Sequence, residues 1–461
     1  MPYPNPPYLP LDYPNVPYPS KVVIKNIGKI VTGDINNPIA KGDTVYIENG
    51  KIAKVGWESE VDLREAELVI DANGMTVIPG LIEPHCHVAP PDYSPITKTV
   101  DFLEGLLYAG ITTVVSEGAH GPGYPKYYDD PVGSKAEAIF FAMLSKYIRP
   151  GGAQKFEAGA VVLVHGLKEE DFKEMAEAGV KYIAEIGGGG IWKAEEVNPM
   201  LGWAKKYGMI ISVHTGPPSI PVSAHVAAEN ILNMNPKPDK LAHFNGGSTP
   251  LPWKELERLL NELPKDVKIE IIYHGNLRIA KKTFEVLKER KELNRVVLGT
   301  DQAIGLAMSW GSLWALMSWI PHANDIPPET VVAMATGNTA DLFGFNRGKI
   351  EVGREADIVI TDKPPASEAE DFLDALAKGD ICAPAMVMVD GKIVSIKGRD
   401  YQPTERSVLI NGIPAEVFDI NDYLFGIPYA RFNPIYLAYF NPTYLKKRFN
   451  EHFKKYFGES L

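Results

Sequence analysis

The chain has 461 residues, of which 45% are hydrophobic and 23% charged, a composition typical of globular proteins that excludes a collagen-like or disordered chain. This length allows about three domains, or one large barrel with smaller additions. The formal net charge of −11 disfavours a polyanion such as nucleic acid as the main partner. Two cysteines, Cys86 and Cys382, cannot form a disulfide framework, which favours a reducing compartment. We therefore expect a cytoplasmic protein, and the short apolar runs predict no membrane partner.

Composition changes at both ends of the chain. Residues 1–20 contain eight Pro and four Tyr, which favours an extended arm without a core of its own. Residues 401–461 form a second extension, and residues 411–461 contain thirteen Phe or Tyr. Aromatic side chains in such number need an existing surface to cover them. We predict that the two extensions pack on a neighbouring subunit and that the protein is a homo-oligomer.

Two segments that flank the middle of the chain are rich in short β-type runs. Residues 21–80 contain KVVIKN and TVYIEN, and residues 345–400 contain EADIVITD and APAMVMVD. Each segment also has a two-residue hairpin signal, Asn-Gly at 49–50 and Asp-Gly at 390–391. Each alone has too few strands to bury a face, so we expect both to form one small composite β-sandwich.

Residues 81–344 alternate short apolar runs with amphipathic helical patterns, which is typical of parallel βαβ units. The eight strand candidates, the first of which starts slightly earlier, span residues 75–83, 111–117, 157–164, 180–186, 209–213, 240–244, 267–273 and 295–300. Eight strands with intervening helices predict an α/β fold of the TIM type, a (β/α)₈ barrel. A doubly wound open sheet is the alternative, but no G-x-G-x-x-G motif follows the first strand.

Histidines gather at the ends of the predicted strands. Seven of the ten histidines follow a strand, namely His85, His87, His120, His165, His214, His243 and His274. Asp301 ends the eighth strand. In a parallel barrel, all strand C-termini open on one face, where active sites are built. Imidazoles and carboxylates that converge there favour a transition-metal site.

The His-x-His pair at the first strand carries a family resemblance. Because side chains alternate along an extended segment, His85 and His87 point to the same side, and Cys86 between them points into the core. The segment PGLIEPHCH resembles the start of the barrel in the metal-dependent amidohydrolase superfamily. ATGNTADLFGF and GKIEVGREADIVITD resemble its return from barrel to sandwich, so the likeness covers about residues 21–400.

Three further stretches, HTGPPSIP, HFNGGSTPLP and LGTD, resemble the enamidase family, which hydrolyses cyclic amides. This resemblance implies a binuclear metal centre held by His85, His87, Glu185, His214, His243 and Asp301. The expected ions are two divalent metals, Zn or Fe first, with Mn or Ni also compatible with imidazole and carboxylate ligands.

Glu185 is the expected bridge between the two ions, at the place where many relatives have a carboxylated lysine. A carboxylate can give one oxygen to each ion and offsets part of their charge in a buried pocket. The alternative for Glu185 is a structural carboxylate paired with a lysine or arginine.

The expected reaction is ring opening of a small cyclic amide by water activated between the two ions. Asp301 is expected to accept the proton of that water and to pass it to the leaving nitrogen. Further strand-end residues are expected to contact substrate or to orient a ligand. These are His120, His165, Thr215, Asn245, His274 and Asn276.

Other functions stay open at this point. IIYHGNLR and QAIGLAMSWGSLW depart from the enamidase pattern in segments that face substrate, so a cyclic imide or hydantoin-type hydrolase or a ring deaminase is the alternative enzyme. A non-catalytic assembly protein on a hydrolase barrel is a further alternative, although all six expected ligand positions carry competent side chains.

Overall fold

The computed structural model describes residues 19–87, 99–118, 130–220, 223–302, 310–396, 403–410 and 412–415. The Pro/Tyr arm before residue 19, the aromatic extension after residue 415 and His120 lie outside this part, so the predictions for them stay predictions. No helix within the described ranges is long and apolar enough to cross a membrane.

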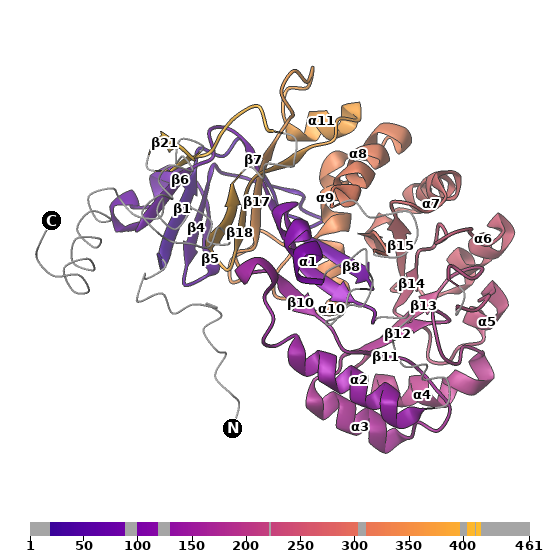
Figure 1. The fold of residues 1–461 in the computed structure, drawn as a ribbon. Helices are drawn as coiled ribbons and strands as arrows, with labels where there is room; N and C mark the ends of the chain where they lie inside the picture. Colours follow the sequence, from indigo (N-terminus) through magenta and orange to yellow (C-terminus); the bar gives the residue numbers. More distant parts are fainter. Residues whose placement is uncertain are drawn as a thin grey trace, which may run out of the picture.

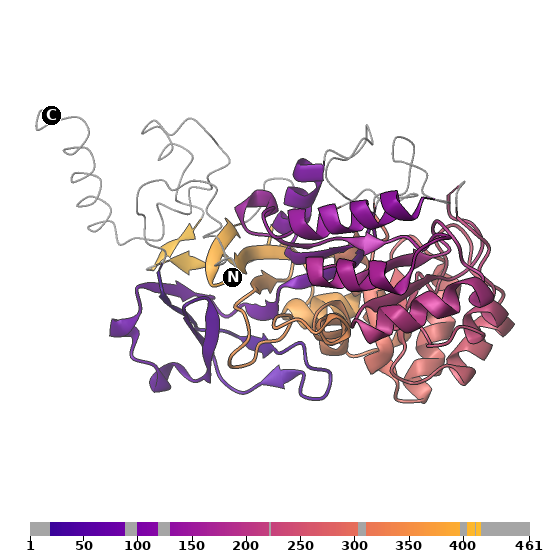
Figure 2. The ribbon, with the colours of Figure 1, turned by 90° about the horizontal axis from the view of Figure 1, so that it is seen from below.

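Two packed sheets form the sandwich, and the second of them combines strands from both flanking segments. The first sheet has the order β21-β20-β6-β1-β4-β5, built from β1 (Lys21–Lys25), β4 (Thr44–Glu48), β5 (Lys51–Gly56), β6 (Leu68–Asp71), β20 (Leu409–Ile410) and β21 (Ile413–Pro414). The second has the order β19-β18-β17-β7-β2-β3, built from β2 (Lys29–Val31), β3 (Ile39–Ala40), β7 (Thr76–Pro79), β17 (Ile358–Asp362), β18 (Ala383–Val389) and β19 (Lys392–Ile396). Antiparallel pairing of β7 with β17 joins the two flanking segments. Because β20 pairs with β6, residues 409–414 belong to the first sheet, although they were expected to lie in a separate C-terminal extension. Figure 2 shows these early strands in indigo beside the late strands in yellow.

The two predicted hairpins are confirmed. Asn49 and Gly50 connect β4 to β5 with φ angles of 50° and 77°. Asp390 and Gly391 connect β18 to β19 with φ angles of 49° and 73°. Positive φ at both central residues is the geometry of a type I′ turn, which matches the twist of the flanking strands.

The middle of the chain forms parallel strands with helices outside them (Figure 1). The strands are β8 (Leu81–Cys86), β9 (Ile111–Ser116), β10 (Lys155–Glu157), β11 (Ala160–Val161), β12 (Tyr182–Ile186), β13 (Ile210–His214), β14 (Lys240–Ala242), β15 (Lys268–Ile272) and β16 (Val296–Gly299). They pair in the orders β10-β9-β8 and β11-β12-β13-β14-β15-β16. A parallel bridge between Cys86 and Gln302 places the end of β8 beside the chain that leaves β16.

The α-helices cover the outside of these strands and one edge of the second sheet. They are α1 (Thr99–Tyr108), α2 (Pro131–Leu144), α3 (Glu169–Ala178), α4 (Ala194–Lys206), α5 (Ala228–Leu232), α6 (Trp253–Glu262), α7 (Leu277–Glu289), α8 (Ser312–Asn324), α9 (Pro328–Ala335), α10 (Gly337–Phe343) and α11 (Phe372–Lys378). The four segments with helical apolar spacing, within 169–179, 199–208, 253–263 and 279–293, fall on α3, α4, α6 and α7. The structure therefore confirms the α/β class.

Two predicted strands are in fact split at glycines. The run 75–83 was predicted as one strand, but β7 joins the sandwich and β8 begins the parallel strands after Gly80. A Cβ atom at Gly80 would lie 2.2 Å from the Thr112 hydroxyl oxygen, so only glycine fits this crossing. The run 157–164 breaks at Gly159, whose φ is 99°, and β10 and β11 pair with different neighbours.

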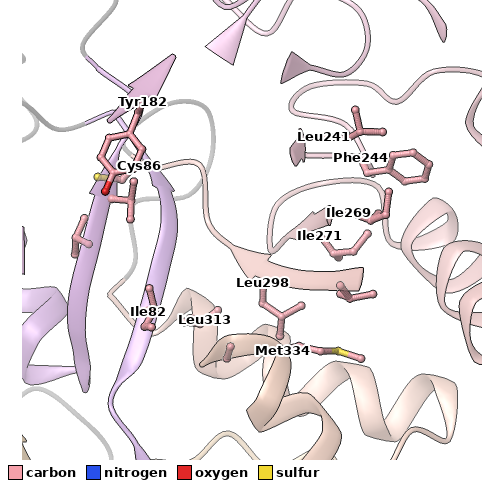
Figure 3. Packing of buried hydrophobic residues seen from close by; sticks show 14 of the residues in the cluster. Ile82, Cys86, Tyr182, Leu241, Phe244, Ile269, Ile271, Leu298, Leu313 and Met334 are labelled. Carbon is pink, nitrogen blue, oxygen red and sulfur yellow. The ribbon is translucent and has the colours of Figure 1, made fainter. Parts of the chain in front are cut away.

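Side chains alternate along each parallel strand. One set packs against the helices, and the other set points to the inner side of the strands, away from the helices. Ile269 and Ile271 of β15 and Leu298 of β16 belong to the apolar cluster that lies between strands and helices (Figure 3). Glu270, between the two isoleucines, is fully buried on the opposite side. The strand interior therefore accepts charged side chains, provided that they are paired.

A buried ion cluster joins the parallel strands to the sandwich. The Lys155 ammonium on β10 lies 2.6 Å from Glu355, 2.8 Å from Asp357 and 2.7 Å from Asp390. Its side chain is only 6% exposed. All three carboxylates come from the segment after the barrel, so this lysine holds the two parts of the chain together.

We expect Lys155→Met to lower the free energy of unfolding by about 3–5 kcal/mol, because it leaves the buried carboxylate of Asp357 without its cation. Denaturant unfolding followed by circular dichroism measures this loss. The matched control is Lys173→Met, since Lys173 is 61% exposed and forms, among the described residues, a single surface ion pair with Glu177 at 3.9 Å. An equal loss in both variants would contradict the role of the buried cluster.

Candidate active site

Four histidines surround the carboxylate of Glu185 at the C-terminal ends of the parallel strands. One oxygen, Oε1, lies 2.6 Å from His214 Nδ1 and 2.6 Å from His243 Nε2. The other, Oε2, lies 3.2 Å from His85 Nε2 and 3.6 Å from His87 Nε2. Each oxygen therefore faces a different pair of imidazoles.

Asp301 closes the cluster on the side of the first pair. Its Oδ1 lies 3.1 Å from His87 Nε2 and 3.5 Å from His85 Nε2. The residue has a left-handed φ of 52°, and its backbone N–H donates to the carbonyl of His85 at 3.0 Å. Aspartate tolerates this conformation better than most residues. The turn directs the carboxylate into the cluster at the end of β16.

Outer hydrogen bonds fix the tautomers of three of these histidines. A carboxylate or carbonyl oxygen can only accept, so the nitrogen that faces it must carry a proton. His85 Nδ1 donates to Glu270 at 2.7 Å, and His87 Nδ1 donates to the carbonyl of Gly118 at 2.9 Å. His214 Nε2 donates to the carbonyl of Pro217 at 2.9 Å. The remaining nitrogens face the cluster, where each could bind a metal ion after losing its proton.

The donor atoms form two sets that share Glu185. One set is His85, His87 and Glu185, and the other is Glu185, His214 and His243, with the ligand atoms of each set within 4.8 Å of one another. The Nε2 atoms of His85 and His87 are 3.1 Å apart. Burial opposes a charge on both rings, but the facing carboxylates outweigh it and raise the pKa of His85 and His87, that of His87 to about 9, so positive charge is favoured at this place. Residues of this kind fit two divalent metal ions.

Charge in this region points the same way. Five carboxylates are buried here and face one buried lysine: Glu83, Glu117, Glu185, Glu270 and Asp301 against Lys240. Burial raises the pKa of Glu83 to about 7, an effect that its hydrogen bonds from Thr300 oppose and the nearby Glu270 reinforces. Counted without the histidines, the excess of negative charge is three or four, depending on the ionisation of Glu83. The nearby carboxylates raise the pKa of His85, His87 and His243, so protonated histidines offset part of this excess while no metal is bound. Two divalent ions would supply four positive charges.

The two inner carboxylates stay ionised. Burial alone would raise the pKa of Glu185, but His243 and His214 outweigh it and hold the pKa well below its ordinary value. Burial likewise opposes ionisation of Asp301, and the facing His85 and His87 lower its pKa. Ionised carboxylates are the form that binds metal and accepts protons.

A small cavity opens beside the cluster. Its volume is about 20 Å³, enough for about one water molecule. The lining residues are His87, Glu185, Gly188, His214, Ser219, Ile220, Ser223, His243 and Asp301. The hydroxyl of Ser219 is buried there and has no hydrogen-bond partner among the described residues. A reacting water would thus meet both carboxylates and one free hydroxyl.

Comparisons with known proteins agree with this geometry. A model of the amidohydrolase family matches residues 76–394. The chain is 41% identical over 392 residues to enamidase from Eubacterium barkeri, and the match covers 85% of this chain and all of that protein.

The chain belongs to the amidohydrolase family.

Solved structures of other amidohydrolases support the fold. The crystal structure of enamidase superposes with a TM-score of 0.80 at 41% identity, over 85% of this chain and 100% of that one. A D-hydantoinase from a Thermus species, at 17% identity and a TM-score of 0.54, covers 82% of this chain and shows the shared fold alone. These matches confirm the resemblance carried by PGLIEPHCH, and the protein is a hydrolase that acts on carbon–nitrogen bonds.

Of the remaining predicted site residues of this amidohydrolase, His274 lies beside the cluster, and Asn245 and Asn276 bond the backbone of nearby loops. His274 Nε2 lies 3.8 Å from Asp301 Oδ2, and burial lowers the pKa of this histidine, so its neutral ring faces the cluster. Asn245 bonds both backbone groups of Ile272, and Asn276 caps helix α7 through Ile279 N. These two amides therefore hold the loops after β14 and β15.

Thr215 and His165 show no link to the cavity. Thr215 is buried directly after His214, and its hydroxyl lies 3.4 Å from the carbonyl of Val213. The His165 side chain is 57% exposed, and its ring lies 3.8 Å from Glu196 on helix α4. Neither residue lines the cavity. Their roles as substrate contacts stay predictions.

Sequence analysis missed four buried charged residues behind the ligands. They are Glu83, Glu117, Lys240 and Glu270. Each stands in or beside an apolar strand, in LIEPHC, VVSEG, KLAHF and KIEII. A charged residue in a strand that is buried on both faces is rare without a partner, and that rarity was the available signal.

We expect the purified, metal-reconstituted protein to contain close to two divalent ions per chain by elemental analysis, because two donor sets share Glu185. His87→Ala should lower the content to about one ion, since the set of His214 and His243 stays intact. His165→Ala is the matched control and should keep two ions. A wild-type content near zero would contradict the two donor sets.

Proposed function

We propose that this amidohydrolase opens the ring of a small cyclic amide by hydrolysis, with two divalent ions held by His85, His87, Glu185, His214, His243 and Asp301. The observation that carries the proposal is the position of Glu185, whose two oxygens face different pairs of histidines. The identity of 41% to enamidase over that protein's full length supports a cyclic amide as the substrate class. We also propose that the parallel strands close into a complete (β/α)₈ barrel, as the match to the enamidase structure implies.

The metal ions, when bound, lower the pKa of a water and polarise the amide carbonyl. The protein side chains position the reactants around them. Glu185 and the four histidines hold the centre, and Asp301 stands at its edge with Oδ2 toward His274. Of the residues described, Ser219 lines the same cavity with a hydroxyl that is free to bind a polar group of the substrate.

Asp301 is the proposed proton carrier. Its lowered pKa keeps it ionised, so it can accept a proton from the attacking water. Once protonated, the same carboxyl group can donate to the ring nitrogen as the amide bond breaks. The former ring nitrogen then becomes an amine that stays attached to the opened product. One residue thus serves both half-reactions, because no other ionised carboxylate of the described residues reaches the cavity except the bridging Glu185.

For Asp301→Asn we expect kcat to fall by about 10²- to 10⁴-fold, because an amide cannot accept the proton. The measurement is steady-state turnover together with metal content. Asp341→Asn is the control, since Asp341 is 52% exposed and pairs with Lys349 on the surface. Turnover close to that of the wild type would remove Asp301 from the mechanism.

A substrate panel tests the proposed substrate class. Five- and six-membered lactams, cyclic imides, hydantoins and ring amidines should be incubated with the metal-loaded protein, and ring opening and ammonia release measured separately. We expect lactam ring opening without ammonia. Ammonia release from an amidine would instead support a deaminase, and hydrolysis of imides or hydantoins alone would support the imidase alternative.

A further inference from the structure

A buried chain of charged side chains lies behind the proposed ligands. Glu270 on β15 accepts a hydrogen bond from His85 Nδ1 at 2.7 Å and another from the backbone N–H of His243 at 2.8 Å, both at Oε2. These two histidines belong to different donor sets. One carboxylate oxygen is therefore in contact with a ligand residue of each set.

Lys240 on β14 holds that carboxylate from the other side. Its ammonium lies 3.2 Å from Glu270 Oε1, 2.7 Å from Glu117 Oε1 and 3.2 Å from the carbonyl of Pro84. Pro84 precedes His85, and Glu117 precedes Gly118, whose carbonyl accepts from His87 Nδ1. The lysine therefore contacts, directly or through one residue, the segments that fix both histidines of the first set.

We propose that Glu270 and Lys240 are positioning residues that hold the ring of His85 in the tautomer and orientation needed to bind metal and hold the backbone of His243 in place. The proposal rests on the metal site given under the proposed function. Neither residue lines the cavity, so neither is expected to touch substrate.

A purely structural role explains the arrangement less well. A buried ion pair is weak support for stability, since well-packed apolar residues of the same volume often do as well or better. An acceptor carboxylate at His85 Nδ1 does something that an apolar residue cannot do. It holds a proton on Nδ1, so Nε2, which faces Glu185 and His87, is the nitrogen that would bind a metal ion.

Replacing Glu270 separates the hydrogen bond from the charge. We expect Glu270→Ala to weaken metal binding by about 10- to 100-fold, the usual effect of removing an outer partner of a ligating histidine. Glu270→Gln keeps an oxygen acceptor. We therefore expect its loss of Zn²⁺ affinity to be less than about a third of the loss in Glu270→Ala. Zn²⁺ titration of the metal-free protein against a chromophoric chelator measures both, and the Co²⁺ absorption spectrum reports ligand geometry. Equal losses in both variants would overturn positioning by the hydrogen bond.

Replacing Lys240 gives a test in which charge and position act in opposite directions. Removing a positive charge near a cation site would by itself strengthen cation binding. Weaker Zn²⁺ binding by Lys240→Met would therefore not come from the lost charge, and we expect a loss of about tenfold from lost positioning. Unchanged or tighter binding would overturn the role of Lys240. Should this variant fail to fold, the two Glu270 variants decide the proposal.

Glu157→Gln is the matched control. Glu157 on β10 bonds Arg347 at 2.7 Å and is partly buried, so its loss also disturbs an ion pair within the strands but away from the ligands. We expect lower thermal stability with unchanged Zn²⁺ affinity. A similar loss of affinity here would show that the Glu270 effect is general destabilisation. A wild-type protein that binds no Zn²⁺ would instead contradict the proposed function itself.

Discussion

The burial of the Glu185 carboxylate among four histidines is the constraint on which the rest of the site depends. Removing an ionised carboxylate from water costs several kcal/mol unless cations or donors surround it. The imidazoles that surround Glu185 must be held in place, and their outer partners include a second buried carboxylate, Glu270. That carboxylate needs a cation in turn, and Lys240 supplies it. The buried charge of Glu185 at the strand ends therefore requires two further charged residues, Glu270 and Lys240, behind the histidines.

The backbone departs from regular strand geometry where it delivers these ligands. His243 and Asp301 both follow a strand and both have a positive φ, 32° and 52°. Such conformations are uncommon for residues other than glycine and persist only where neighbouring groups hold them. Here the holders are Glu270, which accepts from His243 N–H, and the carbonyl of His85, which accepts from Asp301 N–H. The deeper layer therefore fixes the backbone of the ligands as well as their rings.

This layering explains what the sequence could predict. Strand-end histidines and Glu185 were predictable, since parallel strands deliver their C-termini to one face whatever their order. Glu270 and Lys240 were not, because each pairs with residues on other strands and no local spacing marks the partner. The apolar run 75–83 also looked continuous, although Gly80 divides it between two sheets. Periodicity identifies a strand, but only packing decides which sheet it joins.

Reaction type and substrate choice consequently depend on different parts of the molecule. The charged interior of the strands sets the ligands, and it leaves little freedom because each carboxylate there must keep its partner. Ser219 lines the cavity and His274 lies 3.8 Å from Asp301, both in segments that follow strands, and their exchange would leave the proposed ligand set in place. Segments that follow strands tolerate change better than the strands themselves. Relatives with one metal-binding interior can therefore act on different rings, and residues of the kind of Ser219 and His274 are where such differences would arise.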